Sequence, residues 1–320
     1  MIDFKKHFIT FISLILLLSA CKKEEIELLT QEVDSHTNYQ LHDVFFVDDS
    51  TGYICGGSKY AIGIFLKTKD GGKTWSVPDS IFPKCAYANF FFNAQEGFVV
   101  GYDSWTGYTN DTAKTFVTGT DIYSPTNAVA YTDRLHGVKV GGDGYANGYI
   151  SATVDGGLNW TSTLYPNNFM AVEFADNTTA FASGFGVIYK SNNAGQTFNP
   201  LDVRGDFFMD MHFATPQVGY FAGYQGVILK TSDGGNSFKK IRAGNQPFSK
   251  RVHFETIEFW DTNIGYAAGD NGYLIKTENG GDTWKTVKQF TSSNLRSIHF
   301  FSATSGVIVG DNGKIFLFNG

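Results

Sequence analysis

Short apolar runs recur along the whole chain, and each is followed by a polar turn and then by a glycine that opens the next run. Residues 44–46, 52–54 and 64–66 form one such series near the start, and a closely similar series begins at residue 211. The runs are rich in Phe, Tyr, Val and Ile, and none is long enough for a helix of ordinary length. This pattern predicts antiparallel β-strands joined by tight turns.

After the third strand of each series comes an octet of the form Ser/Thr-x-Asp-x-Gly-x-Thr-Trp, known as an Asp box. It is complete at residues 68–75, and five looser copies follow. The central acidic or amide residues lie 38 to 46 residues apart and are Asp70, Asp111, Asp155, Asn193, Asp233 and Asn279. A repeat of this length predicts the four-stranded blades of a β-propeller.

The residue types of the octet suit a stabilised turn. Asp or Asn accepts hydrogen bonds from nearby backbone N–H groups, and Gly takes the positive φ that the reversal needs. The final Trp or Phe then covers the turn. We therefore expect these six boxes to stabilise the fold and not to bind a ligand.

A seventh series of strands, at residues 298–300, 306–308 and 315–317, ends the chain without a box or a fourth strand. The first six blades are each expected to have a fourth strand after the box. Residues 26–33 look like a strand but belong to no series of their own. Because a closed ring removes exposed sheet edges, we expect this segment to form the outer strand of blade 7. The predicted fold is all-β, with a seven-bladed β-propeller over residues 26–320.

The N-terminus has the pattern of an exported lipoprotein. Lys5 and Lys6 precede an apolar stretch at residues 8–18, and Leu-Ser-Ala then leads into Cys21. The stretch is too short to span a bilayer but suits a signal peptide, which would cover residues 1–20. Lipidation is expected on Cys21, and residues 21–25 would form a tether. No Asp follows Cys21, which favours the outer membrane of the cell envelope and is compatible with exposure on the cell surface.

Composition excludes some functions. The net charge is −6, so no basic face for nucleic acid is expected. Apart from Cys21 the chain has only Cys55 and Cys85, for which a disulfide and two buried free thiols both remain open. No His/Cys spacing indicates a metal, and no cofactor is expected.

Six boxes at this spacing resemble the bacterial neuraminidase repeat proteins. The motif Gly-x-Ile-x-x-Thr-x-Asp-Gly-Gly-x-Thr-Trp of the photosystem II stability/assembly factor-like propellers is matched well by residues 63–75 and 226–238. The resemblance covers roughly residues 26–320 and is specific for the fold. It implies an exported, seven-bladed, non-catalytic assembly or docking factor, although nothing in the sequence indicates photosynthesis.

Two classes of enzyme share the repeat. Sialidases require an arginine triad whose first member precedes the first box, whereas the arginines of this chain all follow it: Arg134, Arg204, Arg242, Arg251 and Arg296. Xyloglucanase-type glycosidases typically pair two propellers, and this chain has one. We therefore expect no enzymatic activity. The alternative is an extracellular carbohydrate-active enzyme, either a glycoside hydrolase or a lyase.

The first candidate site is the set of turns between second and third strands, on the face opposite the boxes. These turns are short in blades 4–7 and look longer in blades 1–3. The longer ones contain Tyr60, Asp103, Trp105, Tyr108, Asp143, Tyr145 and Asn147. Exposed aromatics beside orienting polar groups favour a patch for a protein or glycan partner. The alternative is that these aromatics lie flat on their own loops.

The second candidate site lies in the central channel. At matching positions of the first strands the chain reads Phe45, Phe91, Ala130, Glu173, His212, Glu258 and His299. Glu173, His212, Glu258 and His299 would form a polar ring that titrates near neutrality or performs acid–base chemistry. An internally hydrogen-bonded, structural role is the favoured interpretation.

Overall fold

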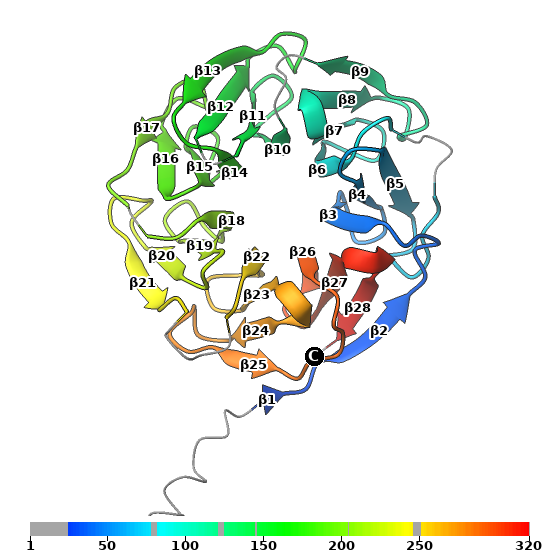
Figure 1. The fold of residues 1–320 in the computed structure, drawn as a ribbon, viewed down its shortest axis with the longest axis vertical. Helices are drawn as coiled ribbons and strands as arrows, with labels where there is room; N and C mark the ends of the chain where they lie inside the picture. The colour runs from blue at the N-terminus through cyan, green and yellow to red at the C-terminus, as the bar shows by residue number, and fades with distance from the viewer. Residues whose placement is uncertain are drawn as a thin grey trace, which may run out of the picture.

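The computed structural model describes residues 25–77, 82–120, 125–144, 146–203, 205–245 and 251–319. In this part of the chain seven β-sheets are arranged in a ring around a central channel, as Figure 1 shows. The predicted seven-bladed, all-β propeller is therefore confirmed. The predicted signal peptide, Cys21 and nearly all of the tether lie outside the described residues.

Each blade runs from an innermost strand beside the channel to an outer strand on the rim. The innermost strands are β3 (Gln40–Phe46), β6 (Ala86–Phe91), β10 (Thr126–Tyr131), β14 (Phe169–Phe174), β18 (Phe208–Phe213), β22 (Phe254–Phe259) and β26 (Leu295–Ser302). The second strands are β4 (Gly52–Ser58), β7 (Gly97–Gly101), β11 (Gly137–Asp143), β15 (Ala180–Gly184), β19 (Gly219–Gly223), β23 (Gly265–Gly269) and β27 (Ser305–Gly310).

The two remaining positions complete the blades. The third strands are β5 (Ile62–Thr68), β8 (Trp105–Thr109), β12 (Asn147–Thr153), β16 (Val187–Ser191), β20 (Ile228–Thr231), β24 (Leu274–Thr277) and β28 (Ile315–Asn319). The outer strands of blades 2 to 7 are β9 (Val117–Thr120), β13 (Thr161–Tyr165), β17 (Asn199–Pro200), β21 (Lys239–Arg242), β25 (Lys285–Val287) and β2 (Leu29–Val33).

The ring closes through the N-terminal segment. Strand β2 pairs antiparallel with β28, from Leu29 opposite Asn319 to Val33 opposite Ile315. This confirms the predicted closure of blade 7. The segment is not a single strand, however, because β1 (Glu25–Ile26) pairs in parallel with β25 and so belongs to blade 6.

In blade 1 the predicted fourth strand falls partly on residues outside the described part of the chain. Among the described residues its sheet has three strands. Beyond the box, only the isolated bridges of Ser76 with Lys67 and of Phe82 with Gly63 continue the ladder. Residues 78–81, between these two bridges, lie outside the described residues.

The Asp-box turns have a common geometry that accounts for their residue types. In blade 1 the Asp70 carboxylate accepts hydrogen bonds from the backbone N–H of Thr74 at 3.0 Å and from its hydroxyl at 2.6 Å. Gly71 and Gly72 have φ of 72° and 79°, a backbone conformation that favours glycine. The buried indole of Trp75 donates to the Gly72 carbonyl at 3.0 Å. The Asp70 carboxylate and the Trp75 indole thus hold the turn from within, and the Gly71 N–H donates to the Ser50 carbonyl outside it.

The core is made of aromatic contacts between neighbouring blades. The second residue of a second strand, which in most blades follows a glycine, stacks on the last residue of the next inner strand, as Tyr53 does on Phe91 with ring centroids 3.8 Å apart. Phe98 on Tyr131 and Phe181 on Phe213 repeat the contact. The recurring Gly-aromatic pattern of the sequence therefore encodes how each blade packs on the next.

Candidate functional site

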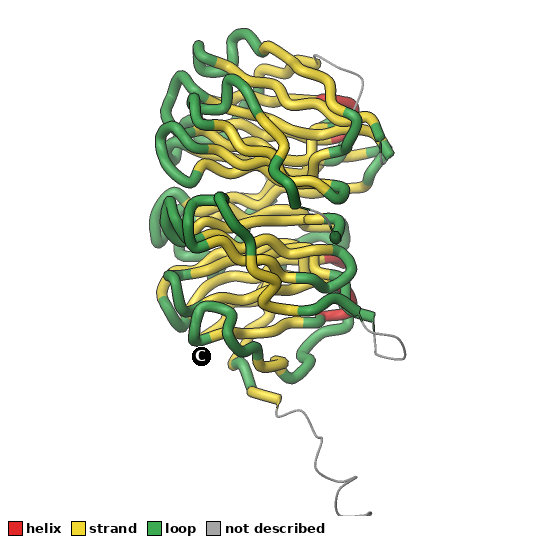
Figure 2. Tube along the Cα trace, turned by 90° about the vertical axis from the view of Figure 1, so that its left-hand side faces the viewer, coloured by secondary structure: helices red, strands yellow, loops and turns green. Residues whose placement is uncertain are grey.

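The two faces of the disk differ. One carries the Asp-box turns, and the other carries the turns between second and third strands, three of which form the 3₁₀ turns η1 (Tyr102–Ser104), η2 (Asp270–Gly272) and η3 (Asp311–Gly313). In the side view of Figure 2 these short red turns lie on one side of the molecule. The channel opens on this side in a cavity of about 520 Å³, which we call the channel mouth.

All seven innermost strands reach the mouth in the same way. Each contains a β-bulge near its start, and the extra residue of the bulge is His42, Tyr87, Asn127, Met170, Met209, Glu255 or Arg296. In every blade this residue and the one after it line the cavity. A bulge turns two successive side chains to the same side of a strand, whereas a regular strand would turn only one. Seven pairs of consecutive side chains therefore form the wall of the mouth.

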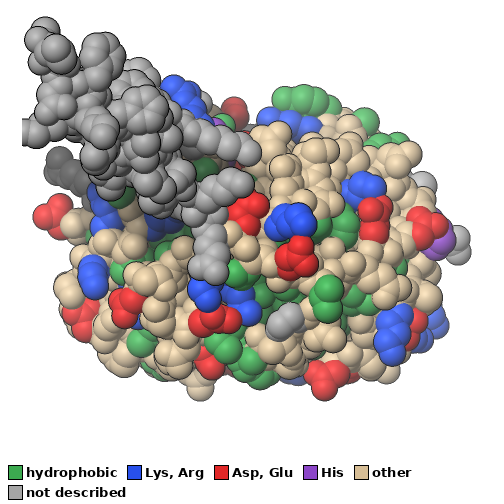
Figure 3. Space-filling model, turned by 90° about the horizontal axis from the view of Figure 1, so that it is seen from below, with side chains coloured by type: hydrophobic (Ala, Val, Ile, Leu, Met, Phe, Trp, Pro, Cys, Tyr) green, Lys and Arg blue, Asp and Glu red, His purple; other side chains and the backbone are tan. Residues whose placement is uncertain are grey.

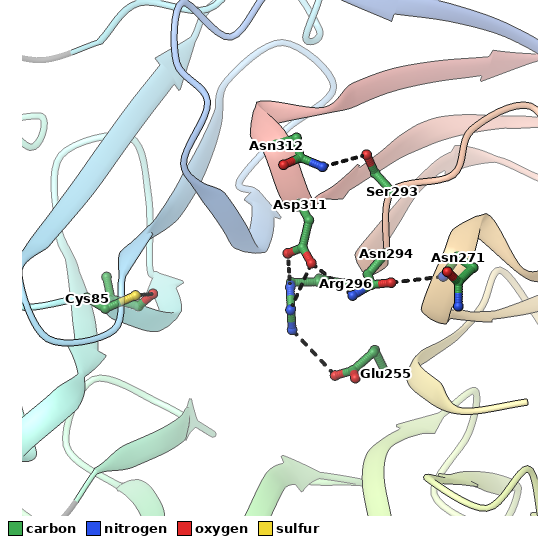
Figure 4. A network of polar contacts seen from close by, with 9 residues as sticks. Cys85, Glu255, Asn271, Ser293, Asn294, Arg296, Asp311 and Asn312 are labelled. Atoms are coloured by element: carbon green, nitrogen blue, oxygen red, sulfur yellow. Dashed lines mark hydrogen bonds and ion pairs between the residues drawn. The ribbon is translucent and has the colours of Figure 1, made fainter.

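The charged side of the mouth is built around Arg296. Its guanidinium donates to Asp311 through Nε at 2.5 Å and through Nη2 at 3.1 Å, and Nη1 lies 3.6 Å from the Glu255 carboxylate. Asn294 donates a further hydrogen bond to Asp311. Figure 4 shows how this network joins Glu255 of blade 6 to the start of β26 and to the η3 turn that follows β27 in blade 7. Two carboxylates hold the guanidinium in one orientation at the edge of the cavity.

Two further carboxylates stand at the base of the mouth. Asp43 accepts a hydrogen bond from the backbone N–H of Asn89 at 2.9 Å, and Asp210 accepts one from the backbone N–H of Ile257 at 2.9 Å. In each case the donor lies on the inner strand of the next blade. Burial raises the pKa of Asp43 to about 6 and that of Asp210 to about 7. Both groups thus tie neighbouring blades together and titrate close to neutrality.

His42 is neutral at the mouth. Burial, and then the nearby charge of Arg296, lower its pKa to about 3. Its ring meets that of Tyr87 edge to face with centroids 5.2 Å apart. Its Nε2 is buried and has no hydrogen-bond partner among the described residues.

Deeper in the channel, three of the four predicted ring residues meet. His212 Nδ1 lies 3.1 Å from the Glu258 carboxylate and 3.8 Å from that of Glu173, which also accepts the backbone N–H of Phe213. Burial raises the pKa of Glu173 to about 7. Burial alone would lower the pKa of His212, but Glu258 and Glu173 outweigh it and raise that pKa to about 9. These three groups do not line the cavity of the mouth.

The rest of the predicted ring is different. His299 stacks on Phe46 with centroids 5.1 Å apart, and burial lowers its pKa. In blade 2 the prediction placed Phe91 at the matching position of the inner strand, and this position is wrong by one residue. Phe91 pairs with Gly97 as Phe46 pairs with Gly52, so that Phe90 is the residue equivalent to Phe45. The ring is polar over blades 4 to 6 and apolar over blades 1 to 3.

The predicted aromatic patch of blades 1–3 is only partly formed. Tyr60 is 66% exposed and its ring lies 5.1 Å from that of Tyr102. Asp103 forms an ion pair with Lys84 at 3.2 Å. Asp143 lines the mouth and pairs with the exposed Asn147 across the blade 3 hairpin. Tyr145 lies outside the described residues.

The assignment of Trp105 and Tyr108 to an exposed loop is wrong. Blade 2 has the same tight turn as blades 6 and 7, because Asp103 takes φ 58° and ψ 36° where Asn271 takes 56° and 35°. Strand β8 therefore begins at Trp105, which is 4% exposed and packs on Phe82. Tyr108, at the other end of β8, packs on Phe98 near the Asp-box face.

Other chemistries find little support in the described part of the chain. It contains no group of three or more His, Cys, Asp and Glu residues that could hold a metal ion. Cys55 and Cys85 are both buried free thiols, and burial raises the pKa of Cys85 to about 12. None of the helices described is long and apolar enough to cross a membrane.

Comparison with known proteins places the fold among assembly factors. The family model described as photosynthesis system II assembly factor YCF48 matches residues 22–118, 200–289 and 246–319. The solved structure of YCF48 bound to a D1 peptide is 19% identical, with a TM-score of 0.73 over 93% of this chain and 100% of that one. No curated protein matches the chain.

Two other solved structures have the same architecture. YCF48 from Cyanidioschyzon merolae is 17% identical, with a TM-score of 0.68 over 91% of this chain and 98% of that one. The WD40 propeller of Doa1 is 10% identical, with a TM-score of 0.68 over 91% and 97%. At these identities the likeness shows the fold alone.

Proposed function

The chain belongs to the photosynthesis system II assembly factor YCF48 family, and from this premise we propose that it is a non-catalytic assembly or docking module that binds a segment of a protein partner. The binding site in this proposal is the channel mouth. The solved relative that carries a D1 peptide supports a peptide segment as the kind of ligand. The partner of this chain need not be related to D1.

The observation that carries the proposal is the wall of seven side-chain pairs around a cavity of about 520 Å³. One side of the wall is apolar and adaptable, with Met170, Met209 and Tyr87. The other side presents Glu255 and Arg296. A protein segment with an apolar side chain next to a charged one complements both sides. Tyr60 and Asp143, near the edge of the mouth, supply additional contacts in this proposal.

A catalytic role has weaker support. Glu173 and Glu258 flank His212, but all three are paired with one another and none lines the cavity of the mouth. Glycoside hydrolysis requires two carboxylates that flank an accessible bond. The arrangement fits a structural cluster better than an acid–base pair. A glycan ligand without turnover stays an alternative outcome of the test below.

The proposal includes export and anchoring through a lipid on Cys21, with the outer membrane of the cell envelope as the location. The support is the signal-peptide pattern before Cys21. Metabolic labelling with an alkyne fatty acid tests this directly. The wild-type protein should be labelled and should sediment with membranes, whereas Cys21→Ser should do neither. Equal labelling of both proteins would contradict the anchor.

The binding proposal is tested with a peptide-display library and the soluble domain, residues 25–320. Selected peptides are measured by fluorescence anisotropy against wild type, Met170→Glu, Met209→Glu and the control Leu158→Glu. Leu158 is 84% exposed on the Asp box of blade 3, far from the mouth. We expect a loss of affinity of about tenfold or more for the two mouth variants, since an unpaired charge would replace an apolar contact. Unchanged affinity in both would overturn the site, and turnover of a glycan substrate would overturn the function.

A further inference from the structure

The N-terminal segment is fixed to the rim of the propeller at one place. Strand β1 pairs with β25 of blade 6, and the Ile26 carbonyl accepts the backbone N–H of Lys288 at 2.8 Å. The chain then continues into β2 on blade 7. Figures 1 and 2 show that the described chain starts on the rim and not on either face.

Side-chain packing holds this start in place. Ile26 and Leu28 pack against the hydrophobic cluster that contains Val287 and Phe316, with Phe290 beside them. The backbone pairing and the apolar contacts both act on the first residues described. The chain is therefore fixed to the propeller from Glu25 onward.

The distance to the anchor follows from chain geometry, and this step rests on the lipid anchor of the proposed function. Four peptide units separate Cys21 from Glu25. Fully extended, they span at most about 14 Å. A lipid on Cys21 therefore keeps the start of β1 within that distance of the membrane surface, whatever the conformation of the tether.

The surface around β1 is compatible with a lipid bilayer. Three lysines of the described residues are paired with glutamates: Lys288 with Glu27 at 2.8 Å, Lys314 with Glu32 at 2.5 Å and Lys285 with Glu278 at 3.4 Å. Figure 3 looks onto this side of the rim and shows acidic and basic side chains interspersed. Leu29, on the outer strand, is 73% exposed. Paired charges are neither strongly attracted nor repelled by anionic headgroups. The lipid anchor, and not electrostatic attraction, therefore determines which part of the propeller lies against the membrane.

We propose that the rim of blades 6 and 7 is a membrane-facing surface, on which the propeller stands on its edge against the lipid headgroups. Both flat faces are then roughly perpendicular to the bilayer, and the channel mouth opens sideways along the membrane surface. Blade 3, across the ring from this rim, is farthest from the lipid.

The test measures energy transfer from the protein to the membrane. The full-length lipidated protein is reconstituted in vesicles of phosphatidylcholine and phosphatidylglycerol with a headgroup-labelled acceptor lipid. A donor dye is placed by Gln31→Cys on blade 7, Gln289→Cys on blade 6 or Thr163→Cys on blade 3, all three of which are exposed positions. Cys55 and Cys85 are buried, so they contribute little labelling.

We expect transfer from positions 31 and 289 to exceed that from position 163 severalfold, with little change between 0.05 and 0.5 M salt. A 20-residue Gly-Ser spacer between Glu24 and Glu25, which adds about 25 Å of flexible reach, should reduce the difference. Equal transfer from all three positions of an anchored protein would overturn the orientation alone. Failure of the wild type to bind vesicles would overturn the anchor and the orientation together.

Discussion

The ring of Tyr220 in blade 5 lies flat on that of Phe259 in blade 6, with centroids 3.6 Å apart and planes at 7°. The Tyr220 hydroxyl donates to the Thr262 carbonyl at 3.0 Å. One fully buried side chain therefore joins two blades through both an aromatic stack and a hydrogen bond.

This contact predicts a graded loss of stability. Tyr220→Phe removes the hydrogen bond and should lower the free energy of unfolding by about 1 kcal/mol. Tyr220→Ala also removes the stack and leaves a cavity, and should cost about 3–5 kcal/mol. Urea unfolding followed by tryptophan fluorescence measures both. Equal losses for the two variants would show that the stack contributes nothing.

The closure of the ring predicts that the N-terminal strands are required for cooperative unfolding. Deletion of residues 25–33 removes β1 and β2 and exposes the edge of β28. We expect a broad transition or aggregation in place of a single thermal transition. Removal of residues 1–24 alone is the control and should leave the transition unchanged. A sharp transition in the longer deletion would contradict the role of β2.

Asp210 and His212 predict contributions to stability that fall as pH rises from about 4 to 9, whereas His42 and His299, whose pKa values burial lowers, contribute in the opposite direction below about pH 6.5. The folded pKa of Asp210, about 7, lies above its unfolded value, so its contribution is present below pH 4 and is lost as pH rises through 7. His212 is also raised, to about 9, so its contribution is lost between about pH 6.5 and 9. Both effects have the same sign.

Asp210→Asn isolates the first of these effects. Asn keeps an acceptor for the Ile257 N–H but does not titrate. Free energies of unfolding at pH 5, 6, 7 and 8 should fall less steeply in this variant, by at most about 1.4 kcal/mol per pH unit. An unchanged slope would mean that Asp210 is ionised throughout this range.

A strained turn predicts a stabilising substitution. Ala194, in the Asp box of blade 4, has φ 55°, whereas the equivalent residue of blade 1 is Gly71. Ala194→Gly should raise the free energy of unfolding by about 1 kcal/mol because glycine adopts this conformation without strain. Ala152→Gly, within strand β12 and paired with strands on both sides, is the matched control and should be destabilising by about 0.5–1 kcal/mol. If both variants lose stability, strain at Ala194 is excluded.

Much of this architecture follows from the sequence, but the mouth does not. The six boxes together with the seventh series of strands predicted the number of blades, and the unmatched segment before blade 1 predicted the closure. The mouth depends on seven bulges, and no particular residue type marks their positions in the sequence. Each bulge shifts the direction of the following side chains by one residue. The alternation of inward and outward side chains along a regular strand therefore could not predict that Glu255 and Thr256 both line the cavity.

The errors in blade 2 have a similar origin. Asp103 and Ser104 adopt positive φ although neither is a glycine. The sequence of blade 2 therefore does not show that its turn has the same geometry as the turns of blades 6 and 7. Pairing of Arg296 with Asp311, 15 residues later, is likewise set by the bulge and the turn together. Backbone irregularities, rather than propensities, thus limited the prediction.

The repeated bulge has a consequence for how such a ring acquires new ligands. Because the backbone, not the identity of the side chains, aims each dipeptide at the cavity, Tyr87, Met170 and Met209 can be exchanged without a change in strand pairing. Recognition can therefore diverge one position at a time while the scaffold stays constant, and libraries randomised at these three positions offer a direct route to binders of unrelated peptides.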